Sequence, residues 1–137
     1  MAHWLLKTDA ETYSFDDLLG DKTTHWDGVR NHQARNYLAS MMPGDECFIY
    51  HSGRDPGIVG TARILKAAYC DPKADDPRWL NVDLKVLKRL ARVVPLAEIR
   101  EHKALTQMAL LRQSRLSVSP VTDAEWKAVL ELASEGN

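Results

Sequence analysis

The segment His25-Trp26-Asp27-Gly28-Val29-Arg30-Asn31 brings together side chains that could bind a planar ligand. Trp26 offers a flat aromatic face and one N–H donor, whereas Asn31 offers a paired donor and acceptor that could contact the edge of a heterocycle. Gly28 lies between them as a hinge. Ordinary core elements do not need this mixture, so we expect the segment to form part of a binding site.

The same residues also have structural explanations. Tryptophan is most often part of a core, and Arg30 could contact either a phosphate group or a surface carboxylate. Asp27 could hold its loop in place by capping it. We therefore expect a binding role for Trp26 and Asn31, and a structural role for Asp27 and Arg30.

Other kinds of site have weaker support in the sequence. Five histidines and two cysteines occur without a C-x-x-C or H-E-x-x-H pattern, and Cys47 with His51 would supply only two metal ligands. The glycines form no phosphate-binding loop, and Ser52 lacks the G-x-S-x-G turn of a hydrolase. We expect no metal, no cofactor and no catalytic residue. An enzyme that uses His51 and Asp27 in the same cleft is an alternative.

Several strands are expected to position the site. Trp4–Lys7 and Cys47–Tyr50 are rich in residues that favour strands, and a longer strand begins at Ile58. Gly60 in that strand indicates a bulge or the close approach of another group. Apolar and polar residues alternate over Leu80–Val86, so one side of this strand is buried. Three consecutive strands joined by loops indicate an antiparallel meander.

Helices are expected between and after these strands. Ser14 and Asp17 have the spacing of a capping box before a short helix, and Thr122 with Glu125 has the same spacing before the last one. Pro95 suits the first position of another helix. Two further sets share one helix face each: Ala34, Leu38, Met41 and Met42 after Asn31, and Trp126, Val129, Leu130 and Ala133 near the end.

Length and composition fit one domain over residues 1–137, with 45% apolar residues to build a core. We expect a mixed α+β fold, either a curved sheet or a small barrel, with flanking helices. The net charge is −1, but residues 84–116 hold eight basic residues against two acidic ones. This segment could therefore present a basic face to a polyanion or simply a solvated surface.

The sequence has neither the basic start and long apolar run of a secretory signal nor a run of about 18 apolar residues that could span a bilayer. Cys47 and Cys70 match no disulfide scaffold and are expected to be reduced. We therefore expect a cytoplasmic protein that does not bind membranes.

Three segments together resemble the EVE domain of the PUA-like superfamily: Trp26-Asp27-Gly28-Val29-Arg30-Asn31, Tyr50-His51-Ser52, and Arg115-Leu116-Ser117-Val118-Ser119-Pro120-Val121. The resemblance extends from Trp4 to the helix of Trp126. The chain is similar to the thymocyte nuclear protein family, whose members contain this domain. It implies a PUA-like curved β-barrel with flanking helices, related to the YTH and ASCH domains. Two departures are Asp9-Ala10 in place of Glu-Pro and Ser119 in place of a frequent glutamine.

The resemblance also implies a function. EVE domains are thought to read modified DNA bases, notably 5-methylcytosine and its oxidised forms, so we expect a non-enzymatic reader. Carried over to this sequence, the base-binding residues are Lys7, Thr8, Trp26, Asn31, His51, Ser52 and Trp79. Trp79 could equally serve sheet packing.

The leading hypothesis is a reader that binds one modified base, as a monomer or weak oligomer. A single pocket would bind weakly unless basic residues also contact phosphate groups. The residues expected to do so are Lys85, Lys88, Arg89 and Arg92. Besides the enzyme, a PUA-type module that binds RNA is an alternative, and the sequence does not decide between them.

Overall fold

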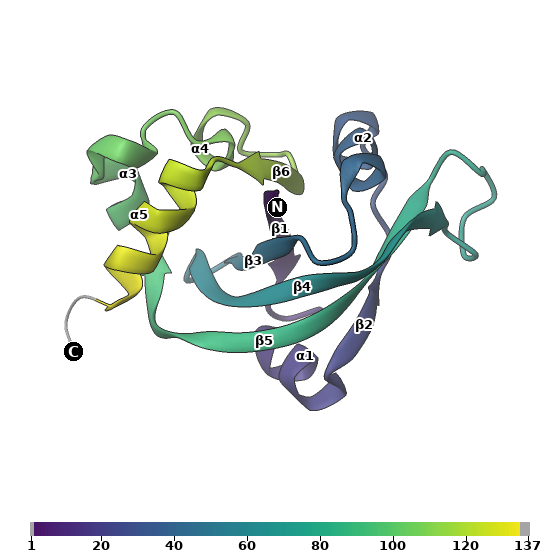
Figure 1. Ribbon diagram of the computed structural model, residues 1–137, viewed down its shortest axis with the longest axis horizontal. Coiled ribbons are helices and arrows are strands. Elements are labelled where there is room, and N and C mark those ends of the chain that lie inside the picture. The colour runs from purple at the N-terminus through teal and green to yellow at the C-terminus, as the bar shows by residue number, and fades with distance from the viewer. Residues whose placement is uncertain (1, 135–137) are drawn as a thin grey trace.

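The computed structural model of the protein describes residues 2–134 (Figure 1). Residues 1 and 135–137, the ends of the predicted domain, lie outside this range. No described helix is long and apolar enough to cross a membrane. In chain order the elements are β1 (His3–Asp9), α1 (Phe15–Asp21), β2 (Thr23–Trp26), α2 (His32–Ser40), β3 (Glu46–Ser52), β4 (Gly57–Cys70), β5 (Leu80–Pro95), α3 (Leu96–Glu101), the short 3-10 helix η1 (Lys103–Leu105), α4 (Ala109–Arg112), β6 (Val118–Val121) and α5 (Asp123–Ser134).

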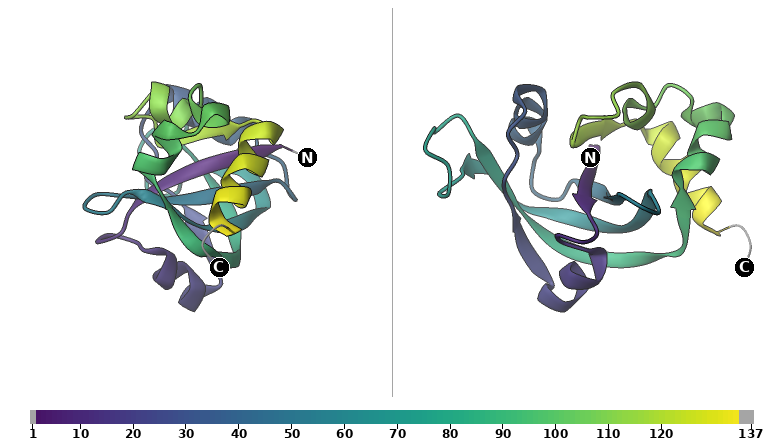
Figure 2. Two further views of the ribbon diagram at one scale, coloured as in Figure 1. Left: turned by 90° about the vertical axis from the view of Figure 1, so that its left-hand side faces the viewer. Right: turned by 180° about the vertical axis from the view of Figure 1, so that it is seen from behind.

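Six strands form one sheet in the order β2-β5-β4-β3-β1-β6. β1 runs parallel to β3, and the other neighbouring strands are antiparallel. The long strands β4 and β5 bend strongly, so that the sheet curves like part of a barrel (Figures 1 and 2). The edge strands β2 and β6 do not pair with each other. The predicted α+β fold with a curved, barrel-like sheet is confirmed, and its hydrogen bonding leaves the sheet open.

The predicted antiparallel meander is β3, β4 and β5, and two of these strands are longer than the sequence pattern indicated. Their pairing shifts register at several points, for example between Ile58 and Gly60, and such bulges allow a strand to bend. A Cβ atom at Gly60 would lie 2.2 Å from Cζ of Phe15, so the close approach expected at this glycine is confirmed. The ring of Phe15 thereby fixes α1 against the sheet.

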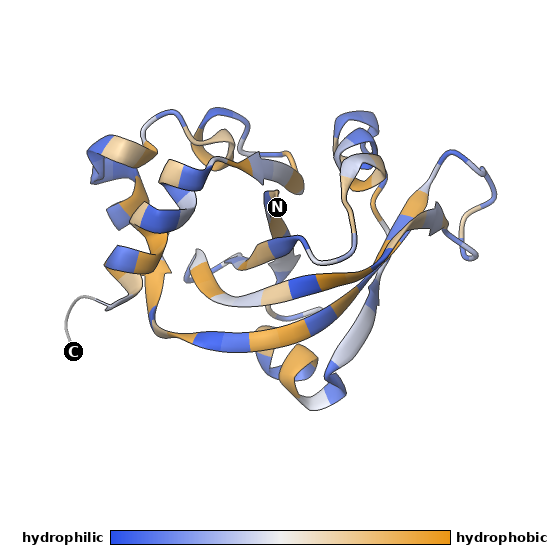
Figure 3. Cartoon of the chain, in the orientation of Figure 1, coloured by the Kyte–Doolittle hydropathy of each residue, from blue (hydrophilic) through white to orange (hydrophobic). Residues whose placement is uncertain are grey.

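Each face of the curved sheet has its own core, because successive residues of a strand point to opposite faces. Leu5 and Phe48 contribute to the core that α3, α4 and α5 cover. Their neighbours Trp4 and Leu6 contribute to the other core, together with Trp26 and residues of α1 and α2. The alternation is visible as bands of orange and blue along the strands (Figure 3). Trp26 thus lies in the core beneath the candidate site.

Both predicted capping boxes are present. The amide of Asp17 donates to Oγ of Ser14 at 3.1 Å, and the amide of Glu125 donates to Oγ1 of Thr122 at 3.1 Å. In each pair the acidic side chain accepts the amide of the capping residue in return, at 2.9 Å. The sequence pattern therefore located the start of α1 and α5 correctly.

Two helix boundaries differ from the prediction. α2 ends at Ser40, and Met42 is 66% exposed because its amide donates to the buried side chain of Asp45 in a turn instead of continuing the helix. Pro95 is the last residue of β5 and has extended backbone angles, so α3 starts one residue later, at Leu96. Both predictions made a helix too long by including residues at or beyond a position with extended backbone angles, namely Met41 after α2 and Pro95 before α3.

The β4–β5 connection, residues 71–79, folds against the segment that joins β2 to α2. Asp71 carries this contact, and its side chain is fully buried. It accepts hydrogen bonds from the amides of Lys73 at 2.8 Å and Gly28 at 3.3 Å, and from Nη1 of Arg30 at 3.1 Å. Burial alone would raise the pKa of Asp71, but these donors hold its pKa below the ordinary value of an aspartate.

Replacing Asp71 with Asn should lower the free energy of unfolding by about 1–3 kcal/mol at pH 7, because the donors lose an ionised acceptor. Since the pKa of Asp71 is lowered in the folded protein, its contribution is complete above the ordinary carboxyl pKa of about 4 and is lost as the pH falls below it. Urea unfolding of both proteins between pH 7 and pH 3 should show the difference shrinking. Asp75→Asn, an exposed change in the same connection, is the control; equal losses for both variants would contradict this role.

Replacing Gly60 with Ala should also destabilise the protein, by about 1–3 kcal/mol, because the new methyl group would overlap the ring of Phe15. Gly20→Ala is the matched control, since Gly20 lies in α1 with no atom within 4 Å of an added Cβ. Alanine is favoured over glycine in helices, so that variant should be slightly more stable. Thermal unfolding measures both changes, and an unchanged melting temperature for Gly60→Ala would show that Phe15 moves aside without cost.

Candidate functional site

A cavity of about 590 Å³ lies between the end of β1 and the end of β2, a size that suits a small ligand. Its walls come from residues 7–9 of β1, residues 12–13 before α1, residues 24–30 of β2 and the following segment, Lys73 and Ser117. We call this cavity the Trp26 pocket. Segments far apart in the chain therefore meet at one place, between the edge strand β2 and the interior strand β1.

Trp26 lines this pocket although only 8% of its surface is exposed. It is the last residue of β2, opposite Val82 of β5, and belongs to the core of its face of the sheet. Tyr13 packs against it edge-on, with ring centroids 6.4 Å apart and an angle of 79° between the rings. Trp26 is therefore both a core residue and part of the pocket wall.

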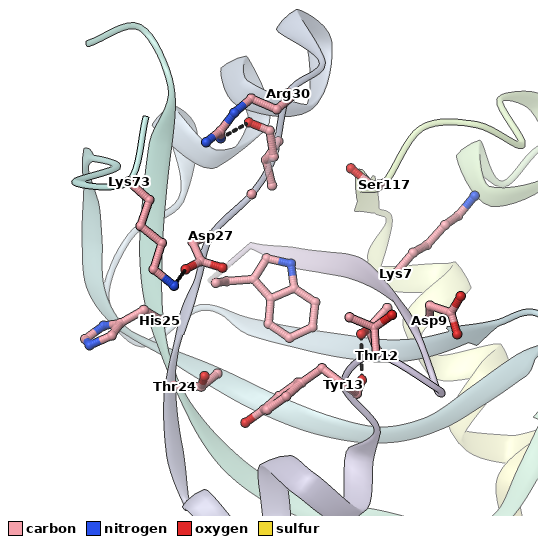
Figure 4. Close-up of a pocket in the computed structure, with 14 residues that line it drawn as sticks. Lys7, Asp9, Thr12, Tyr13, Thr24, His25, Asp27, Arg30, Lys73 and Ser117 are labelled. Carbon is pink, nitrogen blue, oxygen red and sulfur yellow. Dashed lines mark hydrogen bonds and ion pairs between the residues drawn. The ribbon is translucent and has the colours of Figure 1, made fainter. Parts of the chain in front are cut away.

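Charged side chains surround the mouth of the Trp26 pocket. Figure 4 shows Lys7 and Ser117 on one side and Asp27 with Lys73 on the other. Nζ of Lys7 donates to the carbonyl of Ser114 at 2.8 Å, and burial lowers the pKa of Lys7. Nζ of Lys73 lies 3.0 Å from Oδ2 of Asp27. Asp9 also lines the pocket, beside Lys7, so the pocket offers cations and carboxylates on both sides.

Asp27 and Arg30 stabilise the loop that carries the pocket wall, as expected. Arg30 donates to Asp71 and, at 3.0 Å, to the carbonyl of Val29. Asp27 pairs with Lys73 of the β4–β5 connection, so it does not act by capping its own loop, as the sequence had suggested. Both residues nevertheless line the pocket, so a change at either one would alter its wall.

Asn31 lies outside the Trp26 pocket. Its Oδ1 accepts the amide of Ala34 at 2.9 Å and caps the start of α2. This acceptor is therefore used, which leaves only the Nδ2 group of the expected donor and acceptor pair. The residue lines a neighbouring cavity of about 370 Å³ together with Gln33 and residues 112–116.

His51 and Ser52 line a third cavity, of about 470 Å³, which shares Asp9 with the Trp26 pocket. Nε2 of His51 accepts the amide of Phe15 at 2.9 Å, and burial lowers the pKa of His51. The hydroxyl of Ser52 donates to the carbonyl of Thr8 at 3.4 Å. The structure thus brings Lys7, Thr8 and Trp26 together but directs His51 and Ser52 toward the start of α1 and the backbone of β1.

Trp79 also lies outside the pocket, at the end of the β4–β5 connection. Its ring centroid is 4.9 Å from that of His32, and the guanidinium of Arg30 lies 5.7 Å from its centroid. The amide of Asp71 donates a hydrogen bond to the carbonyl of Trp79 at 2.9 Å. These contacts give Trp79 a packing role between the connection and α2.

None of the four basic residues expected to contact phosphate lines the Trp26 pocket. Arg89 forms an ion pair with Asp16, and Arg92 forms one with Glu98. Arg92 also donates to the carbonyl of Leu132 at 2.9 Å. Lys85 and Lys88 lie exposed on β5, and Lys88 lines a shallow cavity beside Trp126. Carboxylates therefore already neutralise two of the four cations.

Sequence reasoning missed three residues that shape the site, namely Tyr13, Asp71 and Lys73. Tyr13 was detectable in part, because it directly precedes the capping residue of α1 and an aromatic residue there often packs on the helix. Asp71 and Lys73 carry no local signal. Their roles depend on how the β4–β5 connection folds back onto residues 27–30, more than 40 positions earlier.

Metal chemistry has no arrangement to support it in residues 2–134, where no three His, Cys, Asp or Glu side chains cluster as ligands. Cys47 is buried and donates to the carbonyl of Ala62, and burial raises the pKa of its thiol. Cys70 is exposed, and neither cysteine forms a disulfide. His51 binds a backbone amide instead of sharing a site with Cys47.

Known proteins share this fold over nearly the whole chain. The model of the EVE domain family matches residues 2–132. Human thymocyte nuclear protein 1 is 38% identical over an alignment that covers 96% of this chain and 73% of that protein. The protein C21.03c of Schizosaccharomyces pombe is 34% identical, with 97% of this chain and 69% of that protein covered.

Solved structures agree with the sequence relatives. The human THYN1 protein, in complex with DNA that contains 5-methylcytosine, superposes with a TM-score of 0.93 at 36% identity over all of both chains. The YTH domain of Zygosaccharomyces rouxii MRB1, in complex with N6-methyladenosine RNA, superposes with a TM-score of 0.62. At 10% identity the latter likeness concerns the fold alone. The chain belongs to the EVE domain family.

Proposed function

We propose that this protein is a non-enzymatic reader of DNA that binds one modified base, of the 5-methylcytosine type, in the Trp26 pocket. The observation that carries the proposal is the pocket itself, where a tryptophan, a tyrosine and convergent polar groups line about 590 Å³. The complex of human THYN1 with DNA containing 5-methylcytosine supports the choice of ligand, since that protein shares this fold at 36% identity.

The aromatic wall suits a base that has left the helical stack. A flipped base loses a few kcal/mol of stacking and pairing, and contact with an aromatic side chain returns about 1–3 kcal/mol. Only 8% of Trp26 is exposed, so the base contacts part of the indole, and Tyr13 adds a second ring beside it. Because the cost of flipping the base is similar to the gain from the aromatic contact, the pocket alone should bind weakly.

The polar groups of the pocket match the edge of cytosine. That edge presents two acceptors, O2 and N3, and one donor, the N4 amino group. Lys7 and Ser117 supply donors on one side of the pocket, and Asp27 supplies a carboxylate on the other (Figure 4). Trp26 also lines the pocket, and we assign its indole N–H, which has no hydrogen-bond partner among residues 2–134, as one more donor.

The residues expected from the family resemblance divide into two groups. We assign Lys7, Thr8 and Trp26 to the pocket wall, in contact with the base. We assign four others to support of that wall through α1, α2 and the β4–β5 connection: Asn31, His51, Ser52 and Trp79.

The geometry gives the enzyme alternative little support. His51 and Asp27 line different cavities, and each already has a partner, the amide of Phe15 and the ammonium group of Lys73. A base that activates a nucleophile must reach that nucleophile directly or through one water molecule. We therefore propose no catalytic step at this site.

Replacing Trp26 with Ala should weaken binding to an oligonucleotide with a single 5-methylcytosine by about 10- to 100-fold, because the base loses its aromatic contact. Trp26→Phe keeps a ring in the core and should retain part of the affinity. Fluorescence anisotropy with methylated and unmodified duplexes measures both, after circular dichroism has verified folding.

Trp126→Ala is the matched control for this experiment, since it removes the same side chain from the core on the opposite face of the sheet, outside the pocket, and should preserve the preference for the methylated duplex. An RNA of the same sequence tests the alternative ligand and should bind more weakly than the DNA. Equal affinity of the wild-type protein for methylated and unmodified DNA would refute the proposed function.

Incubation of the protein with 5-methylcytosine as nucleoside, nucleotide and duplex DNA should yield no product, because no residue of the pocket is placed as nucleophile with its base. Chromatography with mass detection checks this over hours at equimolar protein. Product formation that disappears in His51→Ala while DNA binding persists would establish the enzyme instead.

A further inference from the structure

A second cavity borders the Trp26 pocket and differs from it in charge. It has a volume of about 370 Å³ and is lined by Asn31, Gln33 and residues 112–116. The two cavities share no lining residue, but their linings adjoin along the chain at two places. Arg30 of the pocket directly precedes Asn31, and the segment from Ser114 to Ser117 contacts both, since Lys7 of the pocket holds the carbonyl of Ser114.

The lining of this second cavity is cationic. Arg112 and Arg115 are both exposed, and no Asp or Glu accompanies them there. Within residues 2–134 neither guanidinium group has a hydrogen bond or an ion pair. The cavity that contains His51 and Ser52 has the opposite charge. Its lining includes three acidic residues, Asp9, Glu11 and Asp55, and one arginine, Arg54.

The backbone that carries the two arginines is held in place. The amide of Gln113 donates to the carbonyl of Ala109 at 2.8 Å, and the amide of Leu116 donates to the carbonyl of Gln113 at 3.0 Å. Leu116 is buried in the core that also contains Trp26, and Lys7 binds the carbonyl of Ser114 from below. The backbone positions of both arginines are therefore set before a ligand arrives, so that binding needs to order only their side chains.

We propose that this cavity binds the phosphate groups that flank the base in the Trp26 pocket, with Arg112 and Arg115 as the contacting cations. The proposal rests on the proposed function. A guanidinium group matches a phosphate with two parallel hydrogen bonds, and the Nδ2 group of Asn31, whose Oδ1 caps α2, adds a neutral donor. The phosphate-binding surface then lies beside α2 and α4, whereas the sequence indicated β5.

The test compares two variants that each remove two positive charges, Arg112→Gln/Arg115→Gln and Lys85→Gln/Lys88→Gln. Affinity for a duplex with one 5-methylcytosine is measured between 50 and 400 mM salt. The slope of log K against log salt is negative, and each lost phosphate contact makes it less steep by about 0.9. The arginine variant should therefore have a slope that is smaller in magnitude by about 1.8. At about 0.15 M salt it should bind about 10- to 30-fold more weakly.

The lysine variant should keep the wild-type slope within about 0.5, since charges distant from the ligand are screened. Both variants should keep the wild-type ratio of affinities for methylated and unmodified DNA, which reports on the Trp26 pocket alone. An unchanged slope in the arginine variant, or a larger loss in the lysine variant, would overturn the proposal. Failure of the base-reading function would appear separately, as a wild-type affinity ratio of one.

Discussion

The buried carboxylate of Asp71 is the interaction on which the pocket depends. Gly28 and Arg30 lie before α2, and Asp71 lies more than 40 residues later, so this one buried side chain joins two segments distant in the sequence. The ion pair of Lys73 with Asp27 and the contact of Trp79 with His32 add to the same junction. A buried ion costs several kcal/mol unless donors surround it, and three donors do so here. The loop between β2 and α2 therefore has one stable position, and the wall of the Trp26 pocket has a defined shape.

Much of the fold could be predicted because its signals are local. The capping boxes at Ser14 and Thr122 and the alternation along β5 each depend on residues close in sequence. The glycine at position 60 indicated a close approach, although its partner Phe15 is distant in sequence. The edge strands β2 and β6 escaped prediction because each is only four residues long and is stabilised by a longer neighbour. The element pattern left the choice between a curved sheet and a small barrel open, and the family resemblance supplied the PUA-like arrangement.

The candidate site was predicted less completely, for a related reason. Trp26 stood out as an aromatic residue in a polar segment, and it lines the pocket. Asn31 and His51 carried the same kind of signal, yet their polar atoms bind the amides of Ala34 and Phe15. Residue type alone does not distinguish a side chain that awaits a ligand from one that satisfies a backbone amide. That distinction needs the positions of helix ends, which set where unpaired amides occur.

The parallel pairing of β1 with β3, described above as one exception in an antiparallel sheet, also bears on biosynthesis. β1 lies between β3 and β6, so this strand gains its second neighbour only after Val118–Val121 has been synthesised. Contacts of such large sequence separation form slowly and late in folding. Since Lys7 and Ser117 both line the Trp26 pocket, a nascent chain completes this pocket only after Ser117 has been synthesised and β6 has paired with β1.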